Sequence, residues 1–331
     1  MSDNISFLHN RREALDYSSV LTVVSRYTGV WQQRTFAFLP ALHEAVERHM
    51  RLFINCRQVA ARNAQRLVAE LKGDPLQDIL DAMDGHDDAE MLAMAQDSLK
   101  VVLKRLEAQV AHLVTEQNAL AALPLYNATA DRTRLIAQMD KGDSNQRELR
   151  LLLEQEQAQL ASLEAAIATL EANGLQTRFE GVVPTPEQLG KLAVPGGEAA
   201  LTAEAVAKAI EQLKTVVGDL VEGMRYAQLQ DERRSRTRRT ADLNKQLRQG
   251  DERKGQQQLQ LDALDTLPDL LEQRNQWASG IQRIVVALRS SCEQLSLVQL
   301  NAAADVSSLQ AVFKALLAYE SALLSQDRNA F

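Results

Sequence analysis

Apolar residues recur at intervals of three and four along most of this chain, which is the spacing that lines one side of an α-helix. The first long run predicts a helix over residues 41–72, which begins after Pro40 and ends at a turn in residues 73–75. A second helix is expected to run from about residue 89 to Pro124, because proline interrupts the hydrogen bonds of a helix interior. The pattern therefore predicts long amphipathic helices.

A third segment, residues 129–172, spaces its leucines at three, four and seven residues, which fits the 3.5-residue repeat of coiled coils. Asn173 and Gly174 predict its end, because both residue types accept a left-handed backbone. Residues 141–144 contain a glycine and predict a mild bend midway. Residues 89–172 would then form one long, kinked rod.

Residues 175–200 differ in composition from everything around them. Three of the 7 prolines and four of the 14 glycines fall within this one stretch. We expect a loop or tip there, with a short apolar hairpin. The apolar residues of this tip are Phe179, Val182, Val183, Leu192 and Val194.

Helix resumes near residue 201, and its apolar stripe continues to residue 224. The members of the stripe are Val206, Ile210, Leu213, Val217 and Leu220. About 24 helical residues would extend about 36 Å, enough to cross a hydrocarbon layer of about 30 Å. In a ring of copies this amphipathic helix could line a pore, with the stripe on lipid or neighbours and Lys208, Glu211 and Lys214 on water. An ordinary bundle helix would show the same stripe.

The rest of the chain predicts two more amphipathic helices, after a charged stretch at residues 230–242 that lacks large apolar residues. Short connections should reverse or bend the chain at residues 73–75, 124–128, 250–255 and 301–304. The predicted fold class is all-α, an elongated up-and-down bundle of long helices with a helical hairpin ending in a small head. Residues 1–172 and 201–331 would form the tail bundle and neck, and residues 173–200 the tip that faces a membrane or partner.

Composition and charge narrow the functional classes. Only 4% of the 331 residues are aromatic, and the net charge of −7 argues against general attraction to nucleic acid or anionic membranes. The first residues carry charges where a secretory segment would be apolar, and no stretch reaches the roughly 18 apolar residues of a spanning helix. We expect a soluble chain that is released without a classical signal peptide.

The polar clusters each have a structural explanation. The acidic residues between positions 81 and 90 could hold a cation, but they match no calcium-loop spacing and would also cap the next helix. The five arginines at residues 233–239 could grip phosphates, but the run contains no aromatic residue for base stacking. Acidic neighbours favour a solvated or partner-facing ion-pair surface.

The remaining candidates for chemistry are isolated. No nucleophile lies near His43, His49 or His112 in the sequence, and Cys56 and Cys292 occupy apolar helix positions typical of buried thiols. No glycine-rich phosphate loop occurs. We therefore expect no catalytic residues, no metal site and no cofactor, and a protein that is not an enzyme.

The order of parts, long rods, then a Pro/Gly/Val-rich tip at residues 175–200, then long returning rods, resembles the cytolysin A type of α-helical pore-forming toxins. It is most similar to the B subunit of the alpha-xenorhabdolysin family of binary toxins. The resemblance implies a five-helix tail bundle, a head at the end of a helical hairpin, and assembly with a larger A subunit. The resulting hetero-oligomeric ring would insert its heads into the target cell membrane.

Two functional hypotheses follow. The leading one is a component of a two-part pore-forming toxin that acts by extension of its helices and oligomerisation. The alternative is an intracellular coiled-coil scaffold or adaptor whose rods bind other rods. Nucleic-acid binding through the arginine run is a third, weaker hypothesis, and the tip at residues 175–200 discriminates between the first two.

Overall fold

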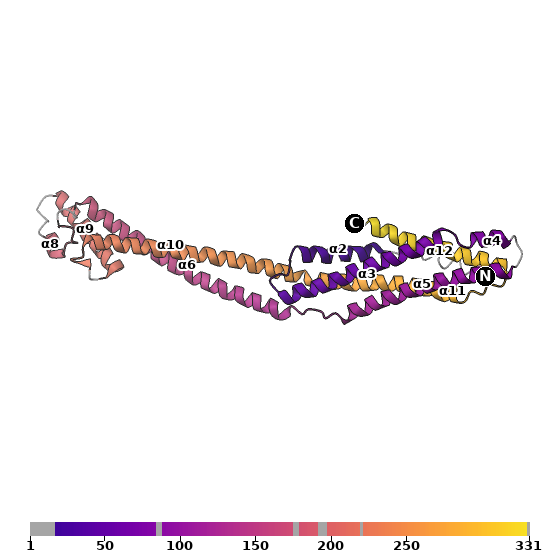
Figure 1. Ribbon diagram of the computed structural model, residues 1–331. Coiled ribbons are helices and arrows are strands. Elements are labelled where there is room, and N and C mark those ends of the chain that lie inside the picture. Colours follow the sequence, from indigo (N-terminus) through magenta and orange to yellow (C-terminus); the bar gives the residue numbers. More distant parts are fainter. Residues whose placement is uncertain (1–16, 84–87, 175–178, 191–196, 219–220, 330–331) are drawn as a thin grey trace. The chain divides into compact units, whose positions relative to one another are not determined.

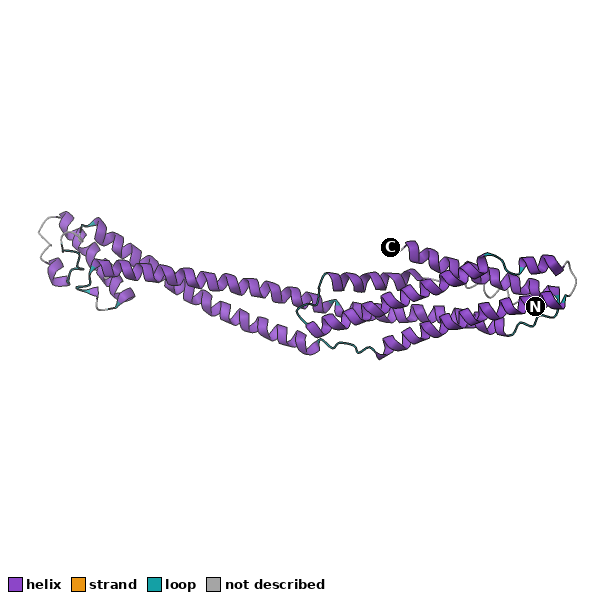
Figure 2. Ribbon diagram, in the orientation of Figure 1, coloured by secondary structure: helices purple, strands orange, loops and turns teal. Residues whose placement is uncertain are grey.

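The computed structural model describes residues 17–83, 88–174, 179–190, 197–218 and 221–329 (Figure 1). Figure 2 shows that the regular elements of this described part are helices, and they are accompanied by one isolated β-bridge. The chain forms two compact units. The first contains residues 1–128 and 262–331, and the second contains residues 129–261.

In its described residues the first unit is a bundle of five long helices and one short helix, which we call the tail bundle. Its helices are α2 (Tyr17–Gln32), α3 (Pro40–Lys72), α4 (Gln77–Met83), α5 (Ala89–Ala122), α11 (Leu267–Ser296) and α12 (Ala303–Asn329). Helix α3 packs against α2, α5 and α12, and α11 packs against α2 and α5. The all-α fold class predicted from the apolar periodicity is confirmed.

Aromatic side chains fill the centre of the tail bundle. Trp277 is 1% exposed and packs against Phe53 in a tilted arrangement with ring centroids 4.7 Å apart, and Tyr27 meets Phe53 edge-on at 4.9 Å. The Tyr27 hydroxyl donates a hydrogen bond to the Leu270 carbonyl at 2.8 Å, which satisfies its polar end inside the core. Such rings bury large apolar areas and therefore account for much of the stability of the bundle.

Two predicted helices of this unit begin and end where the sequence indicated. Helix α3 begins at Pro40 and ends at Lys72, and α5 ends at Ala122, just before Pro124. The Asp88 side chain caps α5 by accepting a hydrogen bond from the Glu90 backbone N–H at 2.8 Å. Part of the acidic cluster therefore has a capping role, while residues 84–87 lie outside the described residues.

The second unit is a helical hairpin with two further helices at one end. Its helices are α6 (Thr129–Ala172), α8 (Pro186–Gly190), α9 (Gly197–Val217) and α10 (Tyr226–Asp265), of which α10 extends beyond the unit. Helices α6 and α10 are antiparallel, as the pairing of Asp143 with Lys254 and of Glu156 with Arg236 demonstrates. Helices α8 and α9 lie at the end of the hairpin where α6 ends and α10 begins (Figure 1).

The glycines of this hairpin do not interrupt its helices. The connection predicted at residues 250–255 is wrong, because α10 continues through both Gly250 and Gly255. Residues 141–144 also lie within the continuous helix α6. A Cβ atom on Gly250 would lie 2.6 Å from Nε2 of Gln146, so this glycine provides space for a side chain of α6.

Candidate functional site

The end of the hairpin contains a separate apolar core, which we call the head core. It draws residues from α6, the tip, α8, α9 and the start of α10. Its members are Leu163, Ala166, Ile167, Leu170, Val183, Leu189, Val206, Ala209, Ile210, Leu213, Val221, Tyr226 and Leu229. Because α6 and α10 contribute six of these 13 residues, the core extends well beyond residues 173–200.

A short backbone pairing fixes the tip against the start of α10. The Val183 N–H donates to the Met224 carbonyl at 2.9 Å, and the Tyr226 N–H donates to the Gly181 carbonyl at 2.7 Å. These bonds flank an antiparallel bridge between Val182 and Arg225. Val182 and Val183 therefore pair with the residues at the start of α10. The predicted hairpin implied pairing with a second strand within the tip instead.

The predicted tip residues take different positions. Val183 is 2% exposed and belongs to the head core, and Phe179 packs partly buried against that core. Val182 is half-buried. Leu192 and Val194 lie outside the described residues. The described apolar residues of the tip are thus packed against protein in this structure, and their predicted contact with a membrane stays a prediction.

The predicted pore helix is also turned inward. Val206, Ile210 and Leu213 are at most 2% exposed, because the stripe of α9 packs against α6. Val217 is partly buried against the same core, and Leu220 lies outside the described residues. Lys208 and Glu211, on the polar face, are exposed as expected.

The C-terminal end of α9 differs from the prediction. The helix ends at Val217, seven residues before the predicted end, and Gly218 follows with φ of +100°. Gly223 has φ of +82°, so two glycines in the left-handed region shape the connection to α10. The stripe seemed continuous in the sequence because Val221 and Met224, beyond the turn, pack against the same core.

Two basic side chains hold this end of α9. Nζ of Lys214 lies 2.7 Å from Glu222 and 3.0 Å from Glu211, and these hydrogen bonds raise the pKa of Lys214. Arg236 donates from Nη2 to the Val216 carbonyl at 3.1 Å. The carbonyls of the last helical turn lack intrahelical partners, so cations are favourable there.

Arg236 is a buried charged residue that the run of arginines did not predict. The run predicts a solvated or partner-facing surface, yet the Arg236 side chain is only 9% exposed. A signal was available, because Leu229, Arg236 and Leu243 follow one another at seven-residue intervals and therefore occupy one side of the helix. Arg234, in contrast, has a side chain that is 64% exposed and pairs with Asp231.

The polar candidates of the tail bundle have structural surroundings. His49 shares a hydrogen bond with the Ala45 carbonyl at 2.7 Å, and burial lowers its pKa. Cys56 and Cys292 are free thiols, and burial raises the pKa of Cys56 to about 12. Among the described residues, no group of three or more His, Cys, Asp or Glu side chains could hold a metal ion.

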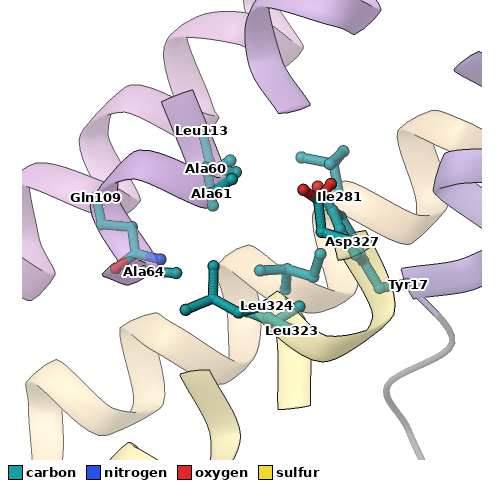
Figure 3. A pocket seen from close by; sticks show the side chains of 11 residues that line it. Tyr17, Ala60, Ala61, Ala64, Gln109, Leu113, Ile281, Leu323, Leu324 and Asp327 are labelled. Atoms are coloured by element: carbon teal, nitrogen blue, oxygen red, sulfur yellow. The ribbon is translucent and has the colours of Figure 1, made fainter. Parts of the chain in front are cut away.

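A small cavity lies inside the tail bundle, and its lining comes from all five long helices (Figure 3). Short side chains of α3, at Ala60, Ala61 and Ala64, leave this space open. Asp327, on its edge, accepts a hydrogen bond from Nε of Arg57 at 2.6 Å. Apolar side chains make up most of the lining.

Comparisons with known proteins give matches of structure and not of sequence. No protein-family model matches the chain, and no curated protein matches it. XaxB from Xenorhabdus nematophila is similar with a TM-score of 0.78 at 13% identity, covering 95% of this chain and 99% of XaxB. PaxB from Photorhabdus luminescens is similar with a TM-score of 0.67 at 13% identity, covering 93% and 96% of the two chains.

A chain of the XaxAB pore complex from Xenorhabdus nematophila is also similar, with a TM-score of 0.52 at 14% identity, covering 96% of this chain and 99% of that one. In the described helices, no segment is both long and apolar enough to cross a membrane. XaxB and PaxB are B subunits of alpha-xenorhabdolysin binary toxins, the group that the order of rods and tip resembles. The chain therefore has the fold of the B subunits of these binary toxins.

Proposed function

We propose that this chain is the B-type component of a two-part pore-forming toxin. It assembles with a larger helical A-type subunit into a hetero-oligomeric ring that permeabilises the target cell membrane. The observation that carries the proposal is the head core, because the apolar stripe of α9 and the tip residue Val183 are packed together at the end of a helical hairpin. The pore complex known for XaxAB supports the same assignment.

The packing of the head core supports a form that precedes membrane insertion. Val206, Ile210 and Leu213 are buried, so no apolar stripe of α9 is available to lipid. The chain would stay soluble after release without a classical signal peptide, until the partner and the membrane meet it.

Opening of the head core would supply the apolar surface that insertion needs. Helix α9 has 21 residues and would span about 32 Å, close to the roughly 30 Å of a hydrocarbon core. Its exposed residues Lys208 and Glu211 would face water in a ring, while its stripe would face lipid or neighbouring helices. Pore formation would then need conformational change and association, and no bond chemistry.

A reversible crosslink tests this proposal. Val182 and Arg225 are bridge partners flanked by hydrogen bonds on both sides, an arrangement that places Cα atoms about 4.5 Å apart. This separation suits a disulfide, so the double variant V182C/R225C should form one when oxidised. The bond would tie the tip to α10 and keep the head core closed.

The assay mixes the chain with a larger helical A-type subunit and measures dye release from liposomes and lysis of red cells. The native chain should cause release only with its partner. The oxidised double variant should stay inactive and recover activity when a reductant opens the bond, and the single variants control for each cysteine. Intact membranes with the native pair, although the two proteins bind each other, would favour the scaffold instead.

A further inference from the structure

Arg236 is buried in the second unit, close to the head core. Its side chain is 9% exposed. Among the lysines and arginines of the described residues, it is the one that is buried. A buried guanidinium is costly unless ionic and hydrogen-bonding partners surround it. The partners of this residue therefore indicate what its burial achieves.

The contacts of Arg236 join three helices. From α10, Nη1 donates to Oε2 of Glu156 at 3.1 Å and also to the Gln159 side chain, both on α6. Nη2 donates to the Val216 carbonyl of α9 at 3.1 Å. Nε lies 2.9 Å from Oε1 of Glu232 in α10, an ion pair that lacks hydrogen-bond geometry. One side chain thus connects α6, α9 and α10 at the edge of the head core.

The contact with α9 lies just before a glycine that ends the helix. Val216 is in the last turn of α9, and Gly218 follows with φ of +100°. Glycine restricts the backbone less than any other residue, so the chain can change direction at Gly218 at low cost. Apolar contacts of the head core hold α9 without directional preference, whereas the Arg236 bond holds it at one defined place.

We propose that Arg236 is a latch that holds the C-terminal end of α9 against α6 and α10 and so keeps the head core closed. Loss of its contacts would free α9 to turn about Gly218 and expose its apolar stripe. The role of the latch rests on the proposed pore-forming function, but its existence is testable on the chain alone. Two carboxylates, Glu156 and Glu232, balance the buried charge while the latch is closed.

The test compares two charge-removing variants of α10 by hydrogen–deuterium exchange of the full chain without any partner. R236Q removes the latch, and R234Q removes an exposed arginine two residues away that pairs only within its own helix. In R236Q the amides of residues 206–217 should exchange at least about tenfold faster than in the native chain, since local opening governs exchange. R234Q and the amides of α5 and α11 should match the native chain.

Two results would overturn the latch. If the amides of residues 206–217 exchange in R236Q at the same rate as in the native chain, the contacts of Arg236 do not hold α9. Equal acceleration in α6 residues 163–170 would mean that Arg236 supports the whole head core and has no selective role at α9. The variant R236K, which keeps the charge with fewer donors, should give an intermediate exchange rate.

A second measurement tests the latch independently of the proposed function. R236Q should bind a dye that reports exposed apolar surface several-fold more strongly than R234Q, with no partner or membrane present. If this difference is observed but neither variant lyses membranes with the partner subunit, the latch stands and the toxin assignment fails. If R236Q equals R234Q in dye binding and exchange while the native chain lyses cells, the latch is refuted and the toxin assignment stands.

Discussion

The tail bundle and the head core differ in the number of partners that surround a buried ionisable group. At the head core, Arg236 has partners on three helices. In the tail bundle, Glu320 is fully buried, its Oε2 accepts one long hydrogen bond of 3.4 Å from Gln109, and its Oε1 has no hydrogen-bond partner. The first arrangement specifies a contact between helices, and the second lowers the stability of a bundle that can tolerate the cost.

The two regions also differ in the kind of side chain that fills the apolar core. The tail bundle places Trp277, Phe53 and Phe36 among its fully buried side chains. The head core relies on aliphatic residues, and Tyr226 is its aromatic member. Large rings bury more area for each ordered side chain, so the tail should resist unfolding under conditions in which the head opens. The difference suits a molecule with a permanent tail and a convertible head.

The largest expected effect comes from removing the central ring of the tail. W277A should destabilise the tail bundle by about 3–5 kcal/mol, because it leaves a cavity beside Phe53. Urea unfolding monitored by circular dichroism measures the loss. W31A, at the partly exposed second tryptophan, is the matched control and should cost clearly less. Equal costs at the two sites would show that Trp277 contributes no more to the stability of the tail bundle than a partly exposed ring.

The next effect concerns Glu320 and depends on pH. Burial raises the pKa of Glu320 from 4.5 to about 7, so the folded chain keeps a proton that the unfolded chain has released. Stability should therefore fall as pH rises from about 4.5 to 7 and stay reduced above it. E320Q removes this loss and should stabilise the chain at pH 8 by up to roughly 3 kcal/mol, with little change at pH 4.

Thermal unfolding of E320Q and of the native chain across this pH range measures the difference. E44Q, at a carboxylate whose side chain is 66% exposed, should show a small difference that does not vary between pH 4 and pH 8 in the same manner. A gain for E320Q that is the same at all pH values would show that the buried carboxyl does not titrate as its environment indicates.

The sequence predicted most helices of both regions, but not how they contact one another. Pro40, Pro124 and Gly174 lie close to helix ends, because each changes the backbone locally. Arg236 was not recognised, because four neighbouring arginines suggested a solvated surface and only the tertiary partners on α6 and α9 distinguish it. The end of α9 was missed for a related reason, since residues on both sides of Gly218 pack against one core.

The glycines of α10 led to a wrong prediction for a different physical reason. A single glycine costs a helix interior only about 1 kcal/mol, which contacts along the α6–α10 hairpin can offset. Gly250 lies beside Gln146, which donates to Asp251 at 2.9 Å, whereas nothing lies within 4 Å of a Cβ placed on Gly255. The two glycines therefore differ in environment although they look alike in the sequence.

The smallest expected effect concerns the stability of the α6–α10 hairpin and comes from substituting these two glycines. G255A should stabilise α10 by about 0.5–1 kcal/mol, because alanine favours helix and the added methyl meets open space. G250A should gain less or lose stability, since the new methyl displaces Gln146 and its bond to Asp251. Hydrogen exchange of α10 measures both variants. A larger gain in stability for G250A than for G255A would mean that Gln146 moves aside freely. The hairpin would then be held by its ion pairs, such as Lys254 with Asp143, more than by the close approach of its helices.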